Sequence, residues 1–259
     1  MIELNNLSLS YENQLILKNV SCQIESGKVT VLMGKNGCGK STLLRAMARL
    51  LEPQEGEVLL EKQNIYHIPV KKFALRVSLL AQTNFVVENI TVEQLVRYGR
   101  YPYHHFFSSW TSDDEYYVEQ ALELTQIEFL RKKTLDSLSG GQRQRAWIAM
   151  VLAQDTPYIF LDEPTTYLDL NYQLEVLDLL KMLNQKNKKT IVMVLHDLNL
   201  AARYADTIVA LNNKKIELIA APDVVFQKEH IKRIFNLENE VIKDPVHSTP
   251  LCIPLSKAF

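Results

Sequence analysis

The sequence predicts an α/β protein, and three observations support this. Strand and helix patterns alternate along most of the chain, without internal repeats. The segments 158–162 and 190–197 are almost wholly apolar until their polar ends, which is typical of strands in a parallel sheet covered on both faces. The chain has 259 residues and 47% hydrophobic content, enough to bury a large core in one domain or two lobes.

The first elements follow from local patterns. Residues 2–9 and about 16–24 alternate apolar and polar side chains and predict two strands. Residues 28–33 form a β-branched apolar run that predicts a buried strand ending at a glycine. A helix is expected from about 40 to 51, because a proline follows at position 53. The N-terminal third is therefore a strand-rich segment leading into a strand–loop–helix unit.

The middle and the end of the chain have different patterns. Between about 86 and 155 the apolar period is helical, with no convincing strand, so we expect a helical lobe inserted into the sheet domain. From about residue 222 onward there are short helix and strand signals, with prolines at 245, 250 and 254. This last segment, 223–259, is expected to be a short C-terminal extension.

Composition and charge exclude several classes of function. The 29 basic and 30 acidic residues give a net charge of −1, so no global field attracts nucleic acid or anionic lipid. The three cysteines, Cys22, Cys38 and Cys252, show no metal-ligand spacing and suit a reducing cytoplasm. The N-terminus lacks a signal-peptide pattern. The longest apolar run, 146–153, is far below the roughly 20 residues that span a bilayer. We therefore expect no membrane-spanning segment.

A glycine-rich loop indicates phosphate binding. The segment GKNGCGKST, residues 34–42, follows a predicted strand and opens a predicted helix, as the nine-residue phosphate-binding pattern requires. Its backbone N–H groups and the helix N-terminus can surround the phosphates, Lys40 can reach the β- and γ-phosphates, and Ser41 can bind Mg²⁺. The candidate nucleotide-binding residues are Gly34, Asn36, Gly37, Cys38, Gly39, Lys40, Ser41 and Thr42. The sequence thus predicts ATP and Mg²⁺ as ligands.

Two adjacent acids narrow the chemistry. Asp162 ends the buried strand YIFLD, where open α/β sheets place their ligands, and is expected to help hold Mg²⁺. Glu163 follows directly and is free to act as a general base on the attacking water. The pair favours nucleotide hydrolysis over simple binding.

The chain has a second glycine motif, although one phosphate loop is enough to bind its own nucleotide. LSGGQ, residues 138–142, places Ser139 as a helix cap before Gly140 and Gly141, with Gln142 next, and forms an anion site without a phosphate of its own. It resembles the signature motif of ATP-binding cassette (ABC) proteins. The resemblance implies that these residues contact ATP held by the phosphate loop of a second subunit. The arginines that follow are interpreted as a solvated helix face.

Other positions match the same family pattern. Gln82 resembles the glutamine-loop residue that contacts Mg²⁺ and the attacking water, and His196 resembles the switch histidine. Asp169 falls seven residues after Asp162, like the inter-subunit aspartate of the family, and Tyr11 lies at its adenine-stacking position. Lys35 and Cys38 differ from the residues that many family members carry at these two positions. Neither position uses its side chain to contact phosphate.

The resemblance covers residues 1–222 and implies an ABC ATPase domain. The implied fold is a RecA-like P-loop NTPase core with an antiparallel β-subdomain and the inserted helical subdomain. The implied partners are a second copy of the chain, integral-membrane permease subunits and, indirectly, an extracytoplasmic substrate-binding protein, with no nucleic acid. The implied location is peripheral, on the cytoplasmic face of the membrane.

The segments 91–103, 163–180 and 196–206 and the tail resemble ATPases of ferric-siderophore importers in particular. A haem, cobalamin or metal importer, a cassette ATPase acting on DNA or ribosomes, and a regulatory nucleotide-binding module are the alternatives. The aromatic segment YPYHHFFSSW, residues 101–110, is either core or a surface that docks a permease. Residues 98–110 beside Gln82 are expected to form the docking groove.

Overall fold

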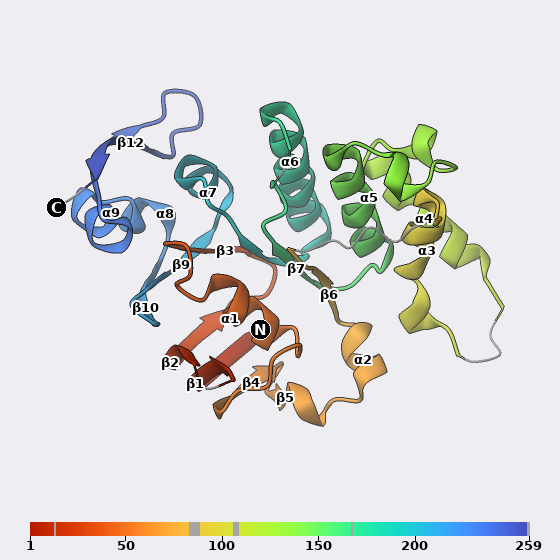
Figure 1. Ribbon diagram of the computed structural model, residues 1–259, viewed down its shortest axis with the longest axis horizontal. Helices are drawn as coiled ribbons and strands as arrows, with labels where there is room; N and C mark the ends of the chain where they lie inside the picture. The colour runs from red at the N-terminus through yellow and green to blue at the C-terminus, as the bar shows by residue number, and fades with distance from the viewer. Residues whose placement is uncertain (13, 83–88, 106–108, 167, 258–259) are drawn as a thin grey trace.

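The structure is a computed structural model that describes residues 1–12, 14–82, 89–105, 109–166 and 168–257. The described residues form two main sheets, called here the larger and the smaller sheet, a two-stranded sheet near the C-terminus, and a helical lobe (Figure 1). The smaller sheet is antiparallel in the order β2-β1-β4-β5, formed by Gln14–Ile24, Ile2–Tyr11, Glu55–Leu60 and Gln63–Asn64. The larger sheet has six strands in the order β10-β9-β3-β8-β7-β6, formed by Lys215–Ala220, Thr207–Asn212, Val29–Gly34, Thr190–Val194, Tyr158–Asp162 and Val77–Leu80. The α/β prediction is confirmed.

The larger sheet is parallel except at its β10 edge, which pairs antiparallel with β9. Strand β3, the strand before the phosphate loop, lies between β8 and β9, and its six residues are all buried. Side chains of β3 alternate between two cores: Leu32 packs on one face, and Val31 and Met33 pack on the other. Both faces are apolar because both are covered, as the apolar strand patterns predicted.

Different helices cover the two faces of the larger sheet. Helix α1, Lys40–Met47, packs between the two sheets, with Leu43, Leu44 and Met47 in their shared core (Figure 1). Helices α6, Leu170–Asn187, and α7, Leu198–Tyr204, cover the opposite face. Short helical segments connect the smaller sheet to β6, namely Ile65–His67 and α2, Val70–Ala74. The expected strand 190–197 ends at Val194, so His196 lies in the loop before α7.

The helical lobe has its own core. Helices α3, Val92–Tyr98, α4, Ser112–Leu124, and α5, Gly140–Ala153, pack around a cluster drawn only from the lobe. Three 3₁₀ turns complete it, at Tyr101–Tyr103, Glu128–Leu130 and Leu135–Ser137. Each of the three helices begins with a capping box, in which the cap side chain and the third helical residue satisfy each other's backbone N–H groups.

A buried ion pair joins the lobe helices. Arg100 contacts Asp114 at 3.0 Å, and each side chain is only 3% exposed. Arg100 also donates to the carbonyl of Ala153 at the end of α5. Gly99 allows the end of α3 to lie close to α5, because a Cβ at that position would lie 2.2 Å from the carbonyl oxygen of Met150.

The C-terminal segment packs against the larger sheet. It contains α8, Pro222–Val225, α9, Lys228–Phe235, and a hairpin of β11, Leu237–Lys243, and β12, Pro250–Lys257. Ile231, Ile234 and Cys252 belong to the core shared with α6 and α7. The side chain of Asn199 in α7 both donates to the carbonyl and accepts from the N–H of Cys252. Tail and sheet therefore share one core.

Candidate ATP-hydrolysing site

The phosphate loop joins the end of β3 to the start of α1. Gly34 has a φ of 144°, and a Cβ there would lie 2.2 Å from the carbonyl oxygen of Leu211, so only glycine fits. Lys40 is 5% exposed, and its ammonium donates to the carbonyls of Gly34 and Lys35 at 3.0 Å each. These bonds fold the lysine back over the loop, where its charge can meet a phosphate.

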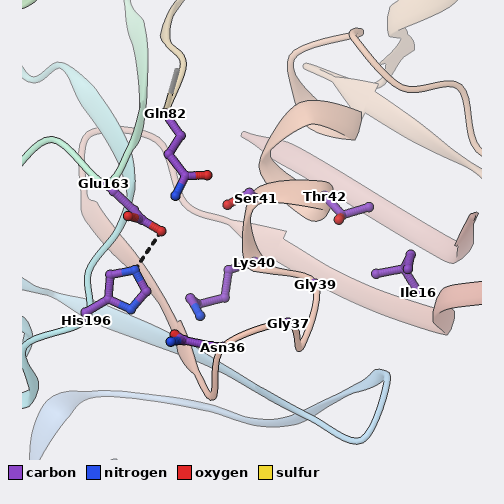
Figure 2. Close-up of a pocket in the computed structure, with 10 residues that line it drawn as sticks. All are labelled: Ile16, Asn36, Gly37, Gly39, Lys40, Ser41, Thr42, Gln82, Glu163 and His196. Carbon is purple, nitrogen blue, oxygen red and sulfur yellow. Dashed lines mark ion pairs between the residues drawn. The ribbon is translucent and has the colours of Figure 1, made fainter. Parts of the chain in front are cut away.

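The loop opens into a pocket of about 450 Å³ (Figure 2). A volume of this size is within the range of small-molecule sites. The pocket is lined by Ile16, Asn36, Gly37, Gly39, Lys40, Ser41, Thr42, Gln82, Glu163 and His196. In Figure 2 the side chains of Lys40, Gln82, Glu163 and His196 gather at one end, and Ile16 lies at the other beyond Thr42. One end can thus take phosphates and the other an apolar part of the ligand.

Asp162 and Ser41 form the part of the site that suits a metal ion. The hydroxyl of Ser41 donates to Oδ1 of Asp162 at 2.7 Å. Asp162 is 1% exposed, and its Oδ2 has no hydrogen-bond partner among the described residues. Burial, reinforced by the charge of Glu163, raises the pKa of Asp162 despite the bond from Ser41. A hydroxyl beside a carboxylate with an unused oxygen is a donor set that fits Mg²⁺, a hard cation that prefers oxygen ligands.

Glu163 and His196, the predicted base and switch histidine, form an ion pair in the pocket. Oε1 of Glu163 lies 2.6 Å from Nε2 of His196, the contact that is dashed in Figure 2. The hydroxyl of Thr166 donates to the other carboxylate oxygen at 3.2 Å. Burial favours the neutral acid, but the bonds and charge from His196, with the bonds from Thr166 and Gln82, outweigh it and lower the pKa of Glu163. The carboxylate is therefore ionised at neutral pH and can accept a proton from water.

The structure brings most of the predicted cis residues together at this pocket. Gly34 and Cys38 shape the loop without lining the pocket, and Asp162 lies just behind Ser41. Tyr11 does not line the pocket either: it ends β1, half-exposed, and its hydroxyl accepts a bond from Arg45 of α1 at 3.3 Å. Ile16 was missed by sequence reasoning, because in an alternating strand nothing marks a pocket residue.

The LSGGQ residues lie elsewhere, at the start of α5. Ser139 caps this helix, accepting from the N–H of Gln142 at 3.3 Å, and the Gln142 amide oxygen accepts from the N–H of Ser139 at 3.2 Å. Ser139 and Gly140 are exposed, Gly141 is partly exposed, and none of these residues lines the pocket. Asp169 is also exposed and caps α6. The residues of the predicted second anion site are thus presented at the surface, outside the lining of the chain's own phosphate-loop pocket.

Most described residues of the aromatic segment 101–110 are exposed, and Pro102 and His104 are partly exposed. Tyr101 is 62% exposed, and Tyr103 and Trp110 are also exposed, so these residues are not core. Tyr98, Tyr101 and Trp110 help line a groove of about 320 Å³ on the helical lobe. Phe106 and Phe107 lie outside the described residues. No described helix has the length and apolar character that crossing a membrane would require.

A phosphate loop, a buried aspartate two strands away and a paired base define a P-loop ATPase. The chain belongs to the ABC transporter family, whose model matches residues 17–166. As a member, it is an ATP-binding subunit whose ATPase activity is coupled to transport. The resemblance seen in the sequence is confirmed.

Relatives and solved structures agree with this assignment. The Bacillus subtilis protein YusV, named as a probable siderophore transport system ATP-binding protein, is 49% identical, covering 98% of this chain and 92% of that relative. The ferric enterobactin transport protein FepC of Escherichia coli is 46% identical over 97% of this chain and 93% of its own length. A metal-chelate type ABC transporter in an inward-facing conformation superposes with a TM-score of 0.84 at 27% identity, covering 99% and 98% of the two chains. The dimeric cassette MJ0796 gives a TM-score of 0.77 at 29% identity, with coverage of 85% and 98%.

Proposed function

We propose that the chain is the ATPase subunit of an importer of iron–siderophore complexes and works as a homodimer on the cytoplasmic face of a membrane. The cargo class is supported by nearly full-length similarity to YusV and FepC, which are ATP-binding proteins of siderophore and ferric enterobactin transport. Peripheral attachment is proposed because relatives such as FepC serve transport systems and the chain offers an exposed groove on its lobe.

The dimer is proposed from the surface position of LSGGQ. In each subunit, ATP would lie on the phosphate loop, with Lys40 beside its phosphates. Stacking of Tyr11 on adenine stays a prediction, because Tyr11 ends β1 outside the lining of the pocket. Ser139 to Gln142 of the other subunit would close the site on the γ-phosphate, because helix N-termini with free N–H groups bind anions. Asp169 of the other subunit is proposed to lie at the same interface between the subunits. The MJ0796 cassette, which has a similar fold, is dimeric.

Hydrolysis would follow from the pair at the end of β7. Glu163 accepts a proton from the attacking water, while the ring of His196 orients the carboxylate and contacts the γ-phosphate. Gln82 lies beside Glu163 at the same end of the pocket (Figure 2), where its amide can hold the same water. Mg²⁺, held by Ser41, Gln82 and Asp162, would neutralise charge on the phosphates.

The groove lined by Tyr98, Tyr101 and Trp110 is proposed to dock a short cytoplasmic helix of a multi-span permease. Replacing Tyr101 by Glu should uncouple transport while ATP binding persists. Phe129 is a matched control, because it is at least as exposed as Tyr101 on the same lobe but does not line the groove. If Phe129→Glu reduces transport as strongly as Tyr101→Glu, the groove is not the docking surface.

Uptake of labelled iron complexes tests the proposed cargo. Cells lacking the gene should lose uptake of ⁵⁵Fe–siderophore and regain it with the parent chain but not with Lys40→Ala, which lacks the phosphate-binding ammonium. Haem and cobalamin uptake are measured in the same cells. Loss of either of these, with siderophore uptake intact, would contradict the iron–siderophore assignment. A membrane pull-down with the tagged chain should recover a multi-span permease.

A further inference from the structure

Helix α5 is bonded directly to the loop that carries the base. The side-chain amide of Gln144 is 8% exposed and donates to the carbonyl of Pro164 at 3.2 Å. Pro164 follows Glu163, whose φ of 56° is unusual for a residue other than glycine. A backbone in this region keeps its conformation only when its surroundings hold it. The contact from α5 is therefore one of those that hold the backbone beside Glu163.

A second contact fixes α5 at the far end of the same loop. We call Glu163 to Asp169, apart from residue 167, the carboxylate turn. Asp169 caps α6, and the guanidinium of Arg145 lies over the ring of Tyr172 in the first turn of α6, 4.2 Å from its centroid. Adjacent residues of α5 therefore fasten both ends of the carboxylate turn.

The other end of α5 is the anion site. Ser139 precedes Gln144 by five residues, and the helix between them is continuous. A helix transmits a displacement of its first turn along its axis because its hydrogen-bonded backbone is stiff. Movement at Ser139 would therefore reach the Gln144–Pro164 bond and, through it, Glu163.

We propose that Gln144 is a positioning residue that couples the two ATP sites of the dimer. When the γ-phosphate of the partner's ATP binds at Ser139, α5 is fixed, and Gln144 then holds the carboxylate turn so that Glu163 of its own subunit faces its own ATP. Each subunit thus hydrolyses ATP fastest when the other site is filled. This inference rests on the proposed dimer.

The same turn offers a matched control. Gln173 of α6 donates its amide to the carbonyl of Leu168 at 2.9 Å. It makes the same type of bond to the same turn but comes from a helix that does not carry the anion site. A role limited to holding the turn predicts equal behaviour of Gln144→Met and Gln173→Met. A role in coupling distinguishes them.

The experiment isolates one site by pairing each test chain with an inactive partner. Test chains with intact Glu163 are mixed, before ATP is added, with an excess of the Glu163→Gln chain, so that nearly every active subunit has a partner that binds ATP without hydrolysing it. Turnover then reports the test chain's own site, which uses its own Glu163 and the partner's intact LSGGQ. Ser139→Ala in the test chain alters only the other site. Scattering at saturating Mg-ATP verifies that the dimer is present.

Ser139→Ala should lower turnover at the opposite site by about 5-fold or more, the lower end of usual coupling between sites. The loss caused by Ser139→Ala should be the same when the test chain also carries Gln173→Met. It should fall below about 2-fold when the test chain also carries Gln144→Met, because the Gln144–Pro164 bond is then already absent. An unchanged loss with Gln144→Met, or no loss in the parent chain within a verified dimer, would overturn the coupling but leave the proposed dimer intact. Absence of an ATP-dependent dimer would overturn both.

Discussion

Replacing Glu163 by Gln should lower ATP turnover by about 10² to 10⁴. The amide keeps the shape of the carboxylate and can still contact His196, which lies 2.6 Å from Oε1 in the parent chain. It cannot accept the proton, however. The loss corresponds to about 2.7 to 5.4 kcal/mol in the activation barrier. Binding of ATP should persist, so the variant should accumulate as a nucleotide-bound dimer.

The adjacent acid should behave differently. Asp162→Asn keeps an oxygen for the hydroxyl of Ser41 but replaces the unpaired, buried Oδ2 with an amide, which repels a cation. We expect Mg-ATP affinity to fall about 10- to 100-fold, the usual cost of altering a metal's surroundings. Because burial raises the pKa of Asp162, its ionised form costs folding stability at neutral pH. The nucleotide-free variant should therefore melt no lower than the parent.

The assay is turnover, nucleotide affinity and oligomeric state for both variants at saturating Mg-ATP, with calorimetric melting to confirm folding. Hydrolysis by Glu163→Gln near the parent rate would refute the assignment of the base and shift that role to His196 or Gln82. Weakened nucleotide binding by Glu163→Gln, with unaffected binding by Asp162→Asn, would reverse the two roles.

Three further outcomes can be measured. Gly99→Ala should destabilise the chain by at least about 1 kcal/mol in denaturant unfolding, since the new methyl meets the carbonyl of Met150. Asp114→Asn should cost about 3 to 5 kcal/mol, because Arg100 is left buried without its counter-charge. Burial favours the neutral form of Asp114, but bonds from Thr111 and Arg100 lower its pKa; its stabilisation is therefore complete above the unfolded pKa and is lost as pH falls through the lower folded value. Tyr11→Ala should weaken ATP binding by about 1 to 3 kcal/mol if the ring stacks on adenine, measured by calorimetric titration, and unchanged affinity would exclude stacking.

Much of the site could be predicted because its chemistry is local in sequence. Lys40 and Ser41 lie in one loop, and the acids at 162 and 163 end one apolar strand, so short patterns reveal them. The parallel arrangement of apolar strands then places these segments at the same edge of the sheet. This is why a single sequence indicates both the fold class and the reactive groups.

The remaining features depend on contacts between distant segments. Ile16 reaches the pocket only because the smaller sheet folds over α1. Gln144 looks like an ordinary polar helix residue until the structure places Pro164 beside it. The expected helix end near 51 also moved, since the chain leaves the helix after Met47 and Arg49 adopts a positive φ of 61°. No residue pattern around Ile16 or Gln144 indicates which distant segment each of them contacts.

The central position of β3 has a consequence for how the chain acquires its fold. Its residues pair with strands made much later, Val29 with Ile191 and Thr30 with Thr207. Pairings so distant in sequence carry a large loop-closure cost and form slowly. The helical lobe, whose core is drawn from residues 92–153 alone, can become ordered first. During synthesis the phosphate loop therefore emerges early but stays without its neighbouring strands until β8 and β9 have left the ribosome, so ATP cannot assist the earlier stages of folding.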